Sequence, residues 1–297
     1  MRMIFDNIEF HNVAELEPCK EGYFMWRVPR EVREKLNESA KNNTSCYGTG
    51  VELRFKIKGD FATLILNAEE SAEAAVAYIY YGSIQGGWEN SSRVIGSRNT
   101  RIKIDKPRNA ELLNQIEEAC RLPFKPDVVR VVLPYLKVRY VGIEGEVEPP
   151  KKEDLPEKTY LAYGSSITHG SLALAAPYTY PFRLSQKLRC DYINFGFAGS
   201  AHMERAMAEY IVSRKDWDFA TVEMGVNMLE MDAEVFEKRI DEFTEVFSRE
   251  DRPIYATSIY GFNTPALQKP GRMFREIVEK YAKRRLRFVD GREILND

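Results

Sequence analysis

The sequence predicts an α/β protein in which an N-terminal, jelly-roll-like β-sandwich precedes a three-layer α/β/α domain built on a parallel sheet. Three observations lead to this fold class. The first half of the 297-residue chain contains many short apolar runs separated by glycine-bearing turns. The second half alternates strand-like apolar runs with stripes of helical spacing. A charged, proline-bearing segment, residues 149–158, separates the two halves.

The first half, residues 1–148, is predicted to form an accessory β-sandwich domain. Residues 51–57 (VELRFKI) alternate apolar and polar side chains, as a half-buried strand does. One amphipathic helix is expected at Asn109–Ala119, because Leu112, Leu113 and Ile116 share a face. The predicted strands are Met3–Phe10, Tyr23–Val28, Val51–Ile57, Phe61–Asn67, Ala74–Tyr81, Arg101–Ile104, Val128–Leu133 and Arg139–Val147.

The second half, residues 159–297, is predicted to be the α/β domain, joined to the first by the linker 149–158 (PPKKEDLPEK). Repeated βα units give a parallel sheet with helices on both faces. Helices are expected at Tyr180–Leu188 and Ala201–Ser213, and around Phe243 and Ile277. The predicted strands are Thr159–Tyr163, Tyr192–Phe195, Phe219–Met224, Pro253–Ile259 and Leu286–Val289.

Composition restricts the class of protein. Lys and Arg number 43 against 45 Asp and Glu, a formal net charge of −2, and 44% of the residues are hydrophobic. This balance argues against a disordered chain and against a nucleic-acid-binding protein, which would carry a basic face. The four cysteines form no C-x-x-C pair, so we expect no metal site, and no sequence feature implies a cofactor. None of these numbers specifies an oligomeric state.

Signals for export or membrane insertion are not found in the sequence. The N-terminus lacks the apolar core and small-residue cleavage site of a secretory signal. No apolar run approaches the roughly 20 residues of a membrane helix. We therefore expect a soluble, cytoplasmic protein with no membrane partner.

Polar loops follow the first three strands of the α/β domain, where open α/β sheets bind their ligands. The first loop is Gly164–Gly170 (GSSITHG), which places serine hydroxyls at the start of a helix. This pattern is typical both of a helix N-cap and of a nucleophilic serine, and alone it leaves both open. The second loop (NFGFAGS) contains Gly199, whose backbone N–H can be exposed, and the third (GVNM) contains Asn227, an amide donor.

The order Gly-Ser-Ser-Ile-Thr-x-Gly, Asn-x-Gly-x-x-Gly, Gly-x-Asn resembles the SGNH (GDSL-like) hydrolase superfamily of esterases and acylhydrolases. The preceding β-sandwich resembles the two-domain arrangement of carbohydrate O-acetyl esterases in that superfamily. The resemblance implies a flavodoxin-like α/β domain with Ser166 as nucleophile. It further implies an oxyanion hole formed by the N–H groups of Ser166 and Gly199 and the side-chain amide of Asn227. The implied substrate is a small acyl ester, such as an O-acetyl group on a carbohydrate, with no metal or cofactor.

Two positions and one missing block depart from the family pattern. Ser165 and Met228 each stand where the family has an aspartate, and no histidine follows Asn227 to supply the family's Asp-x-x-His block. A serine attacks slowly without a base to take its proton. We expect that the natural chain continues past Asp297 into such a block. Two alternatives remain open: another histidine serves as base, or the protein has no base and is a pseudoenzyme.

The scarcity of histidine limits those alternatives, because the chain has only His11, His169 and His202. His169 is the better local candidate for a base, since it lies three residues after Ser166. We nevertheless favour His169 and His202 as polar residues at the rim that bind substrate. The buried position expected for Glu223 requires a hydrogen-bonding partner. The rival functions are a non-catalytic carbohydrate-binding protein and a thioesterase or lipase acting on longer acyl chains.

A group of aromatic residues in the first half also allows two interpretations. The side chains of Tyr78, Tyr80, Tyr81 and Trp88 could stack on sugar rings, or they could pack inside the sandwich. Because alternation within a strand more often reflects packing, we favour the second interpretation.

Overall fold

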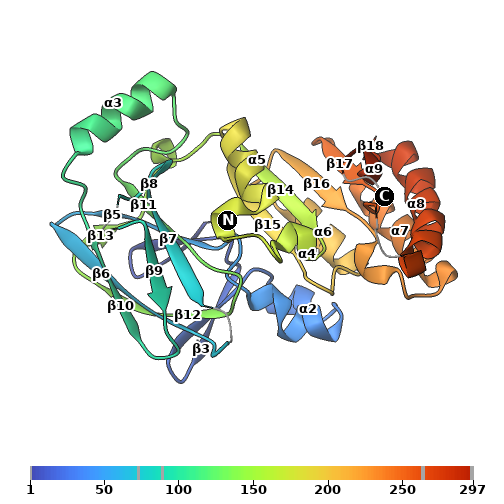
Figure 1. The fold of residues 1–297 in the computed structure, drawn as a ribbon, viewed down its shortest axis with the longest axis horizontal. Coiled ribbons are helices and arrows are strands. Elements are labelled where there is room, and N and C mark those ends of the chain that lie inside the picture. The colour runs from blue at the N-terminus through green and yellow to red at the C-terminus, as the bar shows by residue number, and fades with distance from the viewer. Residues whose placement is uncertain (1, 72–73, 88–89, 262–264, 295–297) are drawn as a thin grey trace.

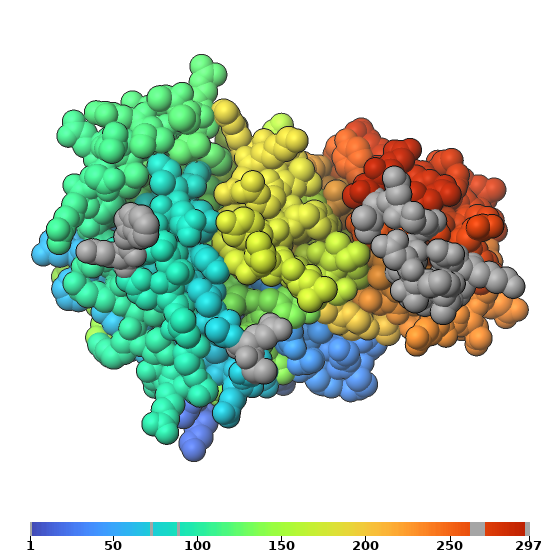
Figure 2. Space-filling view, viewed as in Figure 1, coloured from blue at the N-terminus to red at the C-terminus, as the bar shows by residue number. Residues whose placement is uncertain are grey.

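The computed structural model describes residues 2–71, 74–87, 90–261 and 265–294. It has a β-rich half and an α/β half, whose surfaces are in contact on the face seen in Figure 2. Both halves have the predicted character, and the α/β fold class is confirmed. In the described residues, no helix is both long and apolar enough to cross a bilayer.

The N-terminal half contains two antiparallel sheets that enclose one hydrophobic core, seen on the left of Figure 1. The first sheet contains β1 (Met3–Phe5), β2 (Ile8–His11), β5 (Glu52–Ile57), β11 (Val128–Val132), β7 (Ala75–Tyr81) and β8 (Ile84–Gln85), with β13 (Val147–Glu148) on β5 and β9 (Ser92–Ile95) on β7. The second contains β10 (Thr100–Asp105), β6 (Phe61–Ala68), β12 (Val138–Glu144), β4 (Gly22–Trp26) and β3 (Glu15–Cys19).

The C-terminal half is built on a five-stranded sheet in which every pairing is parallel. Its spatial order places the first strand of the domain between the second and the third, which is the flavodoxin-like order predicted. Because the order reverses beside this first strand, the loops after the first three strands meet at one edge. In spatial order the strands are β15 (Asp191–Gly196), β14 (Thr159–Gly164), β16 (Phe219–Glu223), β17 (Ile254–Thr257) and β18 (Arg287–Val289).

Helices cover both faces of this sheet. Leu161 and Tyr163 of β14 pack in one buried cluster with α6 and α7, whereas Tyr160 and Ala162 pack in another with α5. The α-helices are α1 (Arg30–Arg33), α2 (Glu38–Asn42), α3 (Ala110–Cys120), α4 (Ser166–His169), α5 (Tyr180–Leu188), α6 (Arg205–Ser213), α7 (Ala233–Phe247), α8 (Pro265–Arg285) and α9 (Gly291–Ile294). The 3₁₀ turns are η1 (Thr44–Cys46), η2 (Lys152–Asp154), η3 (Ala176–Tyr178) and η4 (Val226–Met228).

Some predicted boundaries were wrong. The single strand expected at Met3–Phe10 is a hairpin of β1 and β2, because Asp6 and Asn7 adopt left-handed φ values of 50° and 59° and turn the chain. The helix expected from Ala201 begins at Arg205. The short elements β3, β9, α1 and α2 were not predicted, since each is too short to show a clear period.

A segment of the N-terminal half packs onto the α/β domain. Val28, Leu36 and Ala40 belong to the same buried cluster as α6 and α7. Figure 1 shows α2 lying beside the α/β half rather than within the sandwich. The N-terminal half therefore contributes to the core that supports the carboxyl edge of the parallel sheet.

The favoured packing interpretation holds for two of the sandwich aromatics. Tyr80 and Tyr81 are both buried, and the Tyr80 ring lies 5.7 Å from that of Phe182. Trp88 lies outside the described residues.

Candidate active site

The loops that carry Ser166, Gly199 and Asn227 leave the same edge of the parallel sheet. Ser166 opens α4 directly after β14, Gly199 follows β15, and Asn227 lies in η4 after β16. β14 pairs with both neighbours, and its last residue, Gly164, is opposite Gly196 of β15. The sheet therefore brings together the three loops that the sequence singled out.

Ser166 is not the residue that caps its helix. The N-cap of α4 is Ser165, whose Oγ accepts from the N–H of Ile167 at 3.3 Å. Ser166 is the first helical residue and is partly exposed, and its hydroxyl makes no hydrogen bond to the described residues. The loop therefore contains both a helix N-cap and a free serine: Ser165 caps α4, and the hydroxyl of Ser166 is left available for chemistry.

Glu223 fixes the turn from beneath. Its Oε2 accepts from the N–H of Ser165 at 2.7 Å and from the Ser165 hydroxyl at 2.6 Å. The expected partner of this buried carboxyl is thus found, and its role here is structural. Burial raises the pKa of Glu223 against the opposing effect of the Ser165 hydrogen bonds. Oε1 has no hydrogen-bond partner among the described residues.

The Gly199 loop uses nearly all of its N–H groups internally. Those of four neighbours are bonded to protein acceptors: Phe197 (to Gly164 O, 2.8 Å), Ala198 (to His169 Nδ1, 3.2 Å), Ser200 (to Phe197 O, 3.0 Å) and Ala201 (to Asn227 Oδ1, 3.2 Å). The N–H of Gly199 makes no hydrogen bond to the described residues. Gly199 is exposed and has φ +66°, which favours glycine, and the space where a Cβ would project is open. This N–H is therefore available to a ligand.

The side chain of Asn227 is oriented by the same loop. Because the N–H of Ala201 is a donor, the Asn227 atom that faces it must be the carbonyl oxygen Oδ1. The amide NH₂ is consequently directed elsewhere and has no partner among the described residues. Met228, where the family pattern has aspartate, is fully buried in the hydrophobic core.

His169 does not occupy the substrate-binding rim position predicted for it. Its side chain is fully buried and packs against the rings of Tyr47 and Tyr135. Its ring nitrogens lie close to other protein groups: Nδ1 accepts from the N–H of Ala198 at 3.2 Å, and Nε2 lies 3.3 Å from Nη2 of Arg27. Burial, and then the charge of Arg27, hold the pKa of His169 well below its usual value. A ring so enclosed can neither contact substrate nor accept the Ser166 proton.

The other two histidines lie in different surroundings. His202 is partly exposed in the segment that follows Gly199, so its predicted substrate contact stays a prediction. His11 lies between the two halves, with Nε2 2.6 Å from the backbone oxygen of Tyr192.

Sequence analysis missed one residue at this site. Arg27, from the N-terminal half, is fully buried and reaches both His169 and the end of β15. An arginine in the run YFMWRVP carries no motif. Only its burial, which depends on the packing of two distant segments, identifies it.

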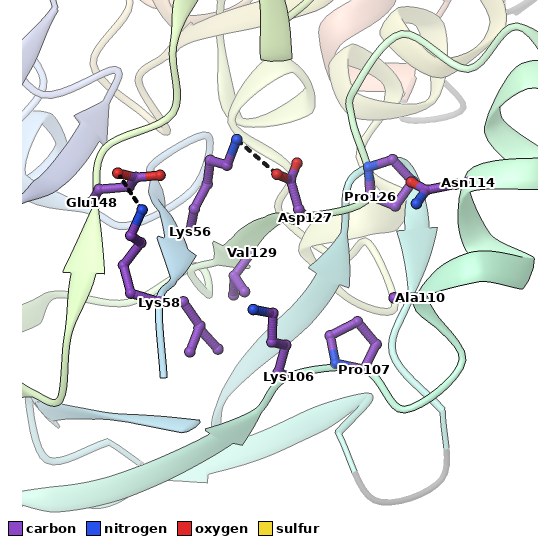
Figure 3. Close-up of a pocket in the computed structure, with 11 residues that line it drawn as sticks. Lys56, Lys58, Lys106, Pro107, Ala110, Asn114, Pro126, Asp127, Val129 and Glu148 are labelled. Carbon is purple, nitrogen blue, oxygen red and sulfur yellow. Dashed lines mark ion pairs between the residues drawn. The ribbon is translucent and has the colours of Figure 1, made fainter. Parts of the chain in front are cut away.

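A separate cavity lies away from these loops. The cavity in Figure 3, of about 300 Å³, lies in the β-sandwich and is lined by β5, β11, β13 and the start of α3. Two of its lysines are paired with carboxylates, Lys56 with Asp127 and Lys58 with Glu148. Neither Ser166 nor Gly199 lines it, so it is not the candidate active site. The described residues contain no group of three acidic, histidine or cysteine side chains placed to hold a metal ion.

Comparisons with known proteins give a family match for the segment that contains these loops. Residues 157–257 match the GDSL-like Lipase/Acylhydrolase family. No curated protein sequence matches the chain. The match over 157–257 covers all three loops and confirms the resemblance to the SGNH (GDSL-like) superfamily.

Solved structures share the fold over nearly the whole chain. A salicylyl-acyltransferase from a tetracycline biosynthetic pathway has a TM-score of 0.75 at 16% identity, covering 98% of this chain and 84% of that one. A GDSL-like lipase from Bacteroides ovatus has a TM-score of 0.63 at 15% identity, covering 95% and 84%. A family two carbohydrate esterase from Cellvibrio japonicus has a TM-score of 0.59 at 10% identity, covering 98% and 87%.

Proposed function

We propose that this chain is a serine acylhydrolase that cleaves small acyl esters at Ser166, with O-acetylated carbohydrate as its substrate class. The observation that carries the proposal is the convergence of three unused polar groups at one sheet edge. They are the hydroxyl of Ser166, the N–H of Gly199 and the amide of Asn227. Acyl transfer requires a nucleophile and donors aimed at the oxyanion, and these groups supply both.

In the proposed reaction the Ser166 oxygen attacks the ester carbonyl carbon while its proton passes to a base. The carbonyl oxygen becomes an oxyanion that accepts hydrogen bonds from the N–H groups of Ser166 and Gly199 and from the Asn227 amide. Collapse of the tetrahedral intermediate breaks the bond to the alcohol, which leaves with a proton. Water then releases the acid from the acyl-serine.

The base in this reaction is not His169, because its ring is fully buried and its Nδ1 already accepts from the N–H of Ala198. The test for His202 is the dependence of kcat/KM on pH. If His202 accepts the proton, His202→Gln abolishes the acidic limb of that profile. An unchanged profile excludes His202 as the base.

Support for a small substrate comes from the loop that follows α4. A cavity of about 110 Å³ lies between this loop and the sandwich, lined by small side chains such as Ala173 and Ala176 and by polar ones such as Thr49 and Thr179. The cavity lies near the helix that begins at Ser166: Tyr135 lines it and accepts from the hydroxyl of Ser171, whose N–H donates to the backbone oxygen of Ser166. This volume suits a short acyl group better than a long chain.

The experiment is hydrolysis of p-nitrophenyl esters of increasing chain length by the wild type and by Ser166→Ala. The proposal expects the highest kcat/KM with acetate and loss of turnover in the variant. Equal rates for the two proteins would remove Ser166 from the reaction. A preference for long chains would favour the thioesterase or lipase alternative. Binding of acetylated sugar without turnover would favour the pseudoenzyme.

The assay also includes an alcohol that can accept the acyl group in place of water, because one structural neighbour is an acyltransferase. An acyl-serine can be resolved by an alcohol as well as by water. Formation of a new ester in the presence of an added alcohol would redefine the activity as acyl transfer.

A further inference from the structure

Arg27 extends its guanidinium from the N-terminal half to the end of β15. Nη1 donates to the backbone oxygen of Asn194 at 2.7 Å, and Nη2 donates to that of Gly196 at 2.9 Å. Nη2 also donates to the backbone oxygen of Thr44. No carboxylate among the described residues pairs with this fully buried charge, which is compensated by carbonyl dipoles. Burial lowers the pKa of Arg27 to about 10, so it stays charged at neutral pH.

These contacts lie at the entrance to the Gly199 loop. Gly196 is the last residue of β15, and Gly199 follows three residues later. The guanidinium also lies 5.2 Å from the ring of Phe197 and 3.3 Å from Nε2 of His169. His169 accepts the N–H of Ala198, the residue before Gly199. Arg27 therefore contacts both the last residue of β15 and the histidine ring that binds Ala198.

The same N-terminal segment contacts the far side of the loop. Nδ2 of Asn37 donates to the backbone oxygen of Ser200 at 2.9 Å, and the hydroxyls of Thr44 and Ser200 are 2.8 Å apart. Asn37 also donates through its N–H and Nδ2 to the carboxylate of Glu204. Residues 27–44 thus hold the loop before and after Gly199.

We propose that Arg27 is a positioning residue for acyl transfer, which holds the Gly199 loop so that the Gly199 N–H faces the oxyanion. This inference rests on the proposed function and extends it, because it makes the N-terminal half part of the catalytic apparatus. A donor displaced by about 1 Å can lower the rate by about 100-fold. Loss of Arg27 therefore acts on kcat, since Gly199 binds charge that develops only in the transition state.

Arg54 is a matched control, because it also crosses fully buried from the sandwich to β15. Its guanidinium makes a bidentate ion pair with Asp191, with both N···O distances at 2.6 Å. Asp191 is the first residue of β15, so Arg54 holds the end of the strand opposite the site. If Arg27 merely joins the two halves, substitution of either arginine affects catalysis equally.

The experiment compares Arg27→Met with Arg54→Met in hydrolysis of p-nitrophenyl acetate, with rates corrected for the folded fraction. We expect Arg27→Met to lower kcat by about 100-fold while KM changes less than about threefold. For folded Arg54→Met we expect a kcat close to that of the wild type. Arg27→Lys keeps the charge but reaches fewer carbonyls, so it recovers part of kcat. It also provides a folded variant if Arg27→Met does not fold.

A second measurement does not depend on turnover. Hydrogen–deuterium exchange followed by mass spectrometry is expected to rise at residues 194–204 in the Arg27 variants and to stay unchanged there in Arg54→Met. Equal hydrolysis by the wild type and Ser166→Ala would defeat the proposed function, yet the exchange data would still decide on Arg27. Two results would overturn the inference. One is a wild-type kcat in Arg27→Met, and the other is the same hydrogen exchange at residues 194–204 in the Arg27 variants and in Arg54→Met.

Discussion

The two ends of β15 are held by buried arginines of the N-terminal half in different ways. At the amino end, Arg54 forms ion pairs with Asp191 and Glu52, and Arg130 binds Glu52 in turn. At the carboxyl end, Arg27 binds only backbone oxygens and lies beside a histidine. One end is a closed network of opposite charges, and the other is a charge compensated by dipoles.

The difference shows in the protonation of the groups. Despite burial, which disfavours charge, Asp191 and Glu52 raise the pKa of Arg54, whereas burial dominates at Arg27 and lowers its pKa to about 10. At the amino end, the charges of Arg54 and Asp191 are paired across the contact between the halves. At the carboxyl end, a carboxylate beside the Gly199 loop would oppose an oxyanion, and backbone oxygens carry no full negative charge.

Among substitutions expected to leave the protein folded, the largest effect is on stability at the amino end. Asp191→Asn leaves Arg54 buried without its bidentate partner, and breaking such a pair costs about 3–5 kcal/mol. Urea denaturation monitored by circular dichroism measures this loss. Glu144→Gln, which removes an exposed ion pair with Arg101, is the control and should leave the midpoint unchanged. A midpoint shift no larger than that of the control would show that the amino-end network contributes little.

The next effect is on catalysis at the carboxyl end. Asn227→Ala removes a donor of the proposed oxyanion hole, for which we expect kcat to fall by about 10²–10³-fold with little change in KM. The variant also frees the N–H of Ala201, so circular dichroism must first show that the fold is intact. Steady-state kinetics with p-nitrophenyl acetate provides the measurement. A loss confined to KM would place Asn227 in substrate binding instead.

Acid should weaken the amino end selectively. Burial alone would raise the pKa of Glu52, but Arg130 and Arg54 outweigh it and lower the pKa to about 2, and Arg54 likewise lowers that of Asp191. A carboxyl group whose pKa is lower in the folded than in the unfolded protein stabilises the fold at pH values above its unfolded pKa, which is about 4.5 for Glu52. That stabilisation is lost as the pH falls from about 4.5 towards 2. Thermal melts at pH 7 and pH 3 should show a smaller drop in Tm for Asp191→Asn than for the wild type. Equal drops would contradict the assignment.

The smallest effect is expected within the Gly199 loop. In Gly199→Ala, no atom lies within 4 Å of the new Cβ. The loss of folding free energy therefore comes only from the left-handed backbone at this position and is about 1 kcal/mol. At Gly196 a Cβ would lie 2.1 Å from the backbone nitrogen of His169, so Gly196→Ala should prevent correct folding. Differential scanning calorimetry of both variants checks this contrast, and similar melting temperatures would contradict it.

Much of the fold was predictable because it depends on local periodicity. Tyr180–Leu188 was predicted with its observed limits, since the amphipathic stripe and the flanking turns mark both ends. The alternation of strands and helices after residue 158 requires a parallel sheet, and its edge then defines where Ser166, Gly199 and Asn227 lie. The hairpin at Asp6 and Asn7 was missed because the apolar pattern continues across the turn.

Packing between distant segments was not predictable in the same way. His169 stands in the same loop as Ser166, yet it is buried by Tyr47 and Tyr135 from the N-terminal half. A partly polar loop gives no signal that one of its side chains will be enclosed by another part of the chain. The misplacement of His169 at the rim and the omission of Arg27 have this single cause.

The sequence by itself determined the alternation of strands and helices after residue 158 and the three polar loops, because periodicity and short motifs are local properties. Only the tertiary structure decided which groups in those loops are free to act. Neighbouring acceptors engage the other N–H groups of the Gly199 loop, and Asn227 is oriented by Ala201. The N-terminal half places Arg27 behind that loop. Hydrogen bonding and burial depend on which atoms meet in three dimensions, and residues far apart in the chain supply those atoms.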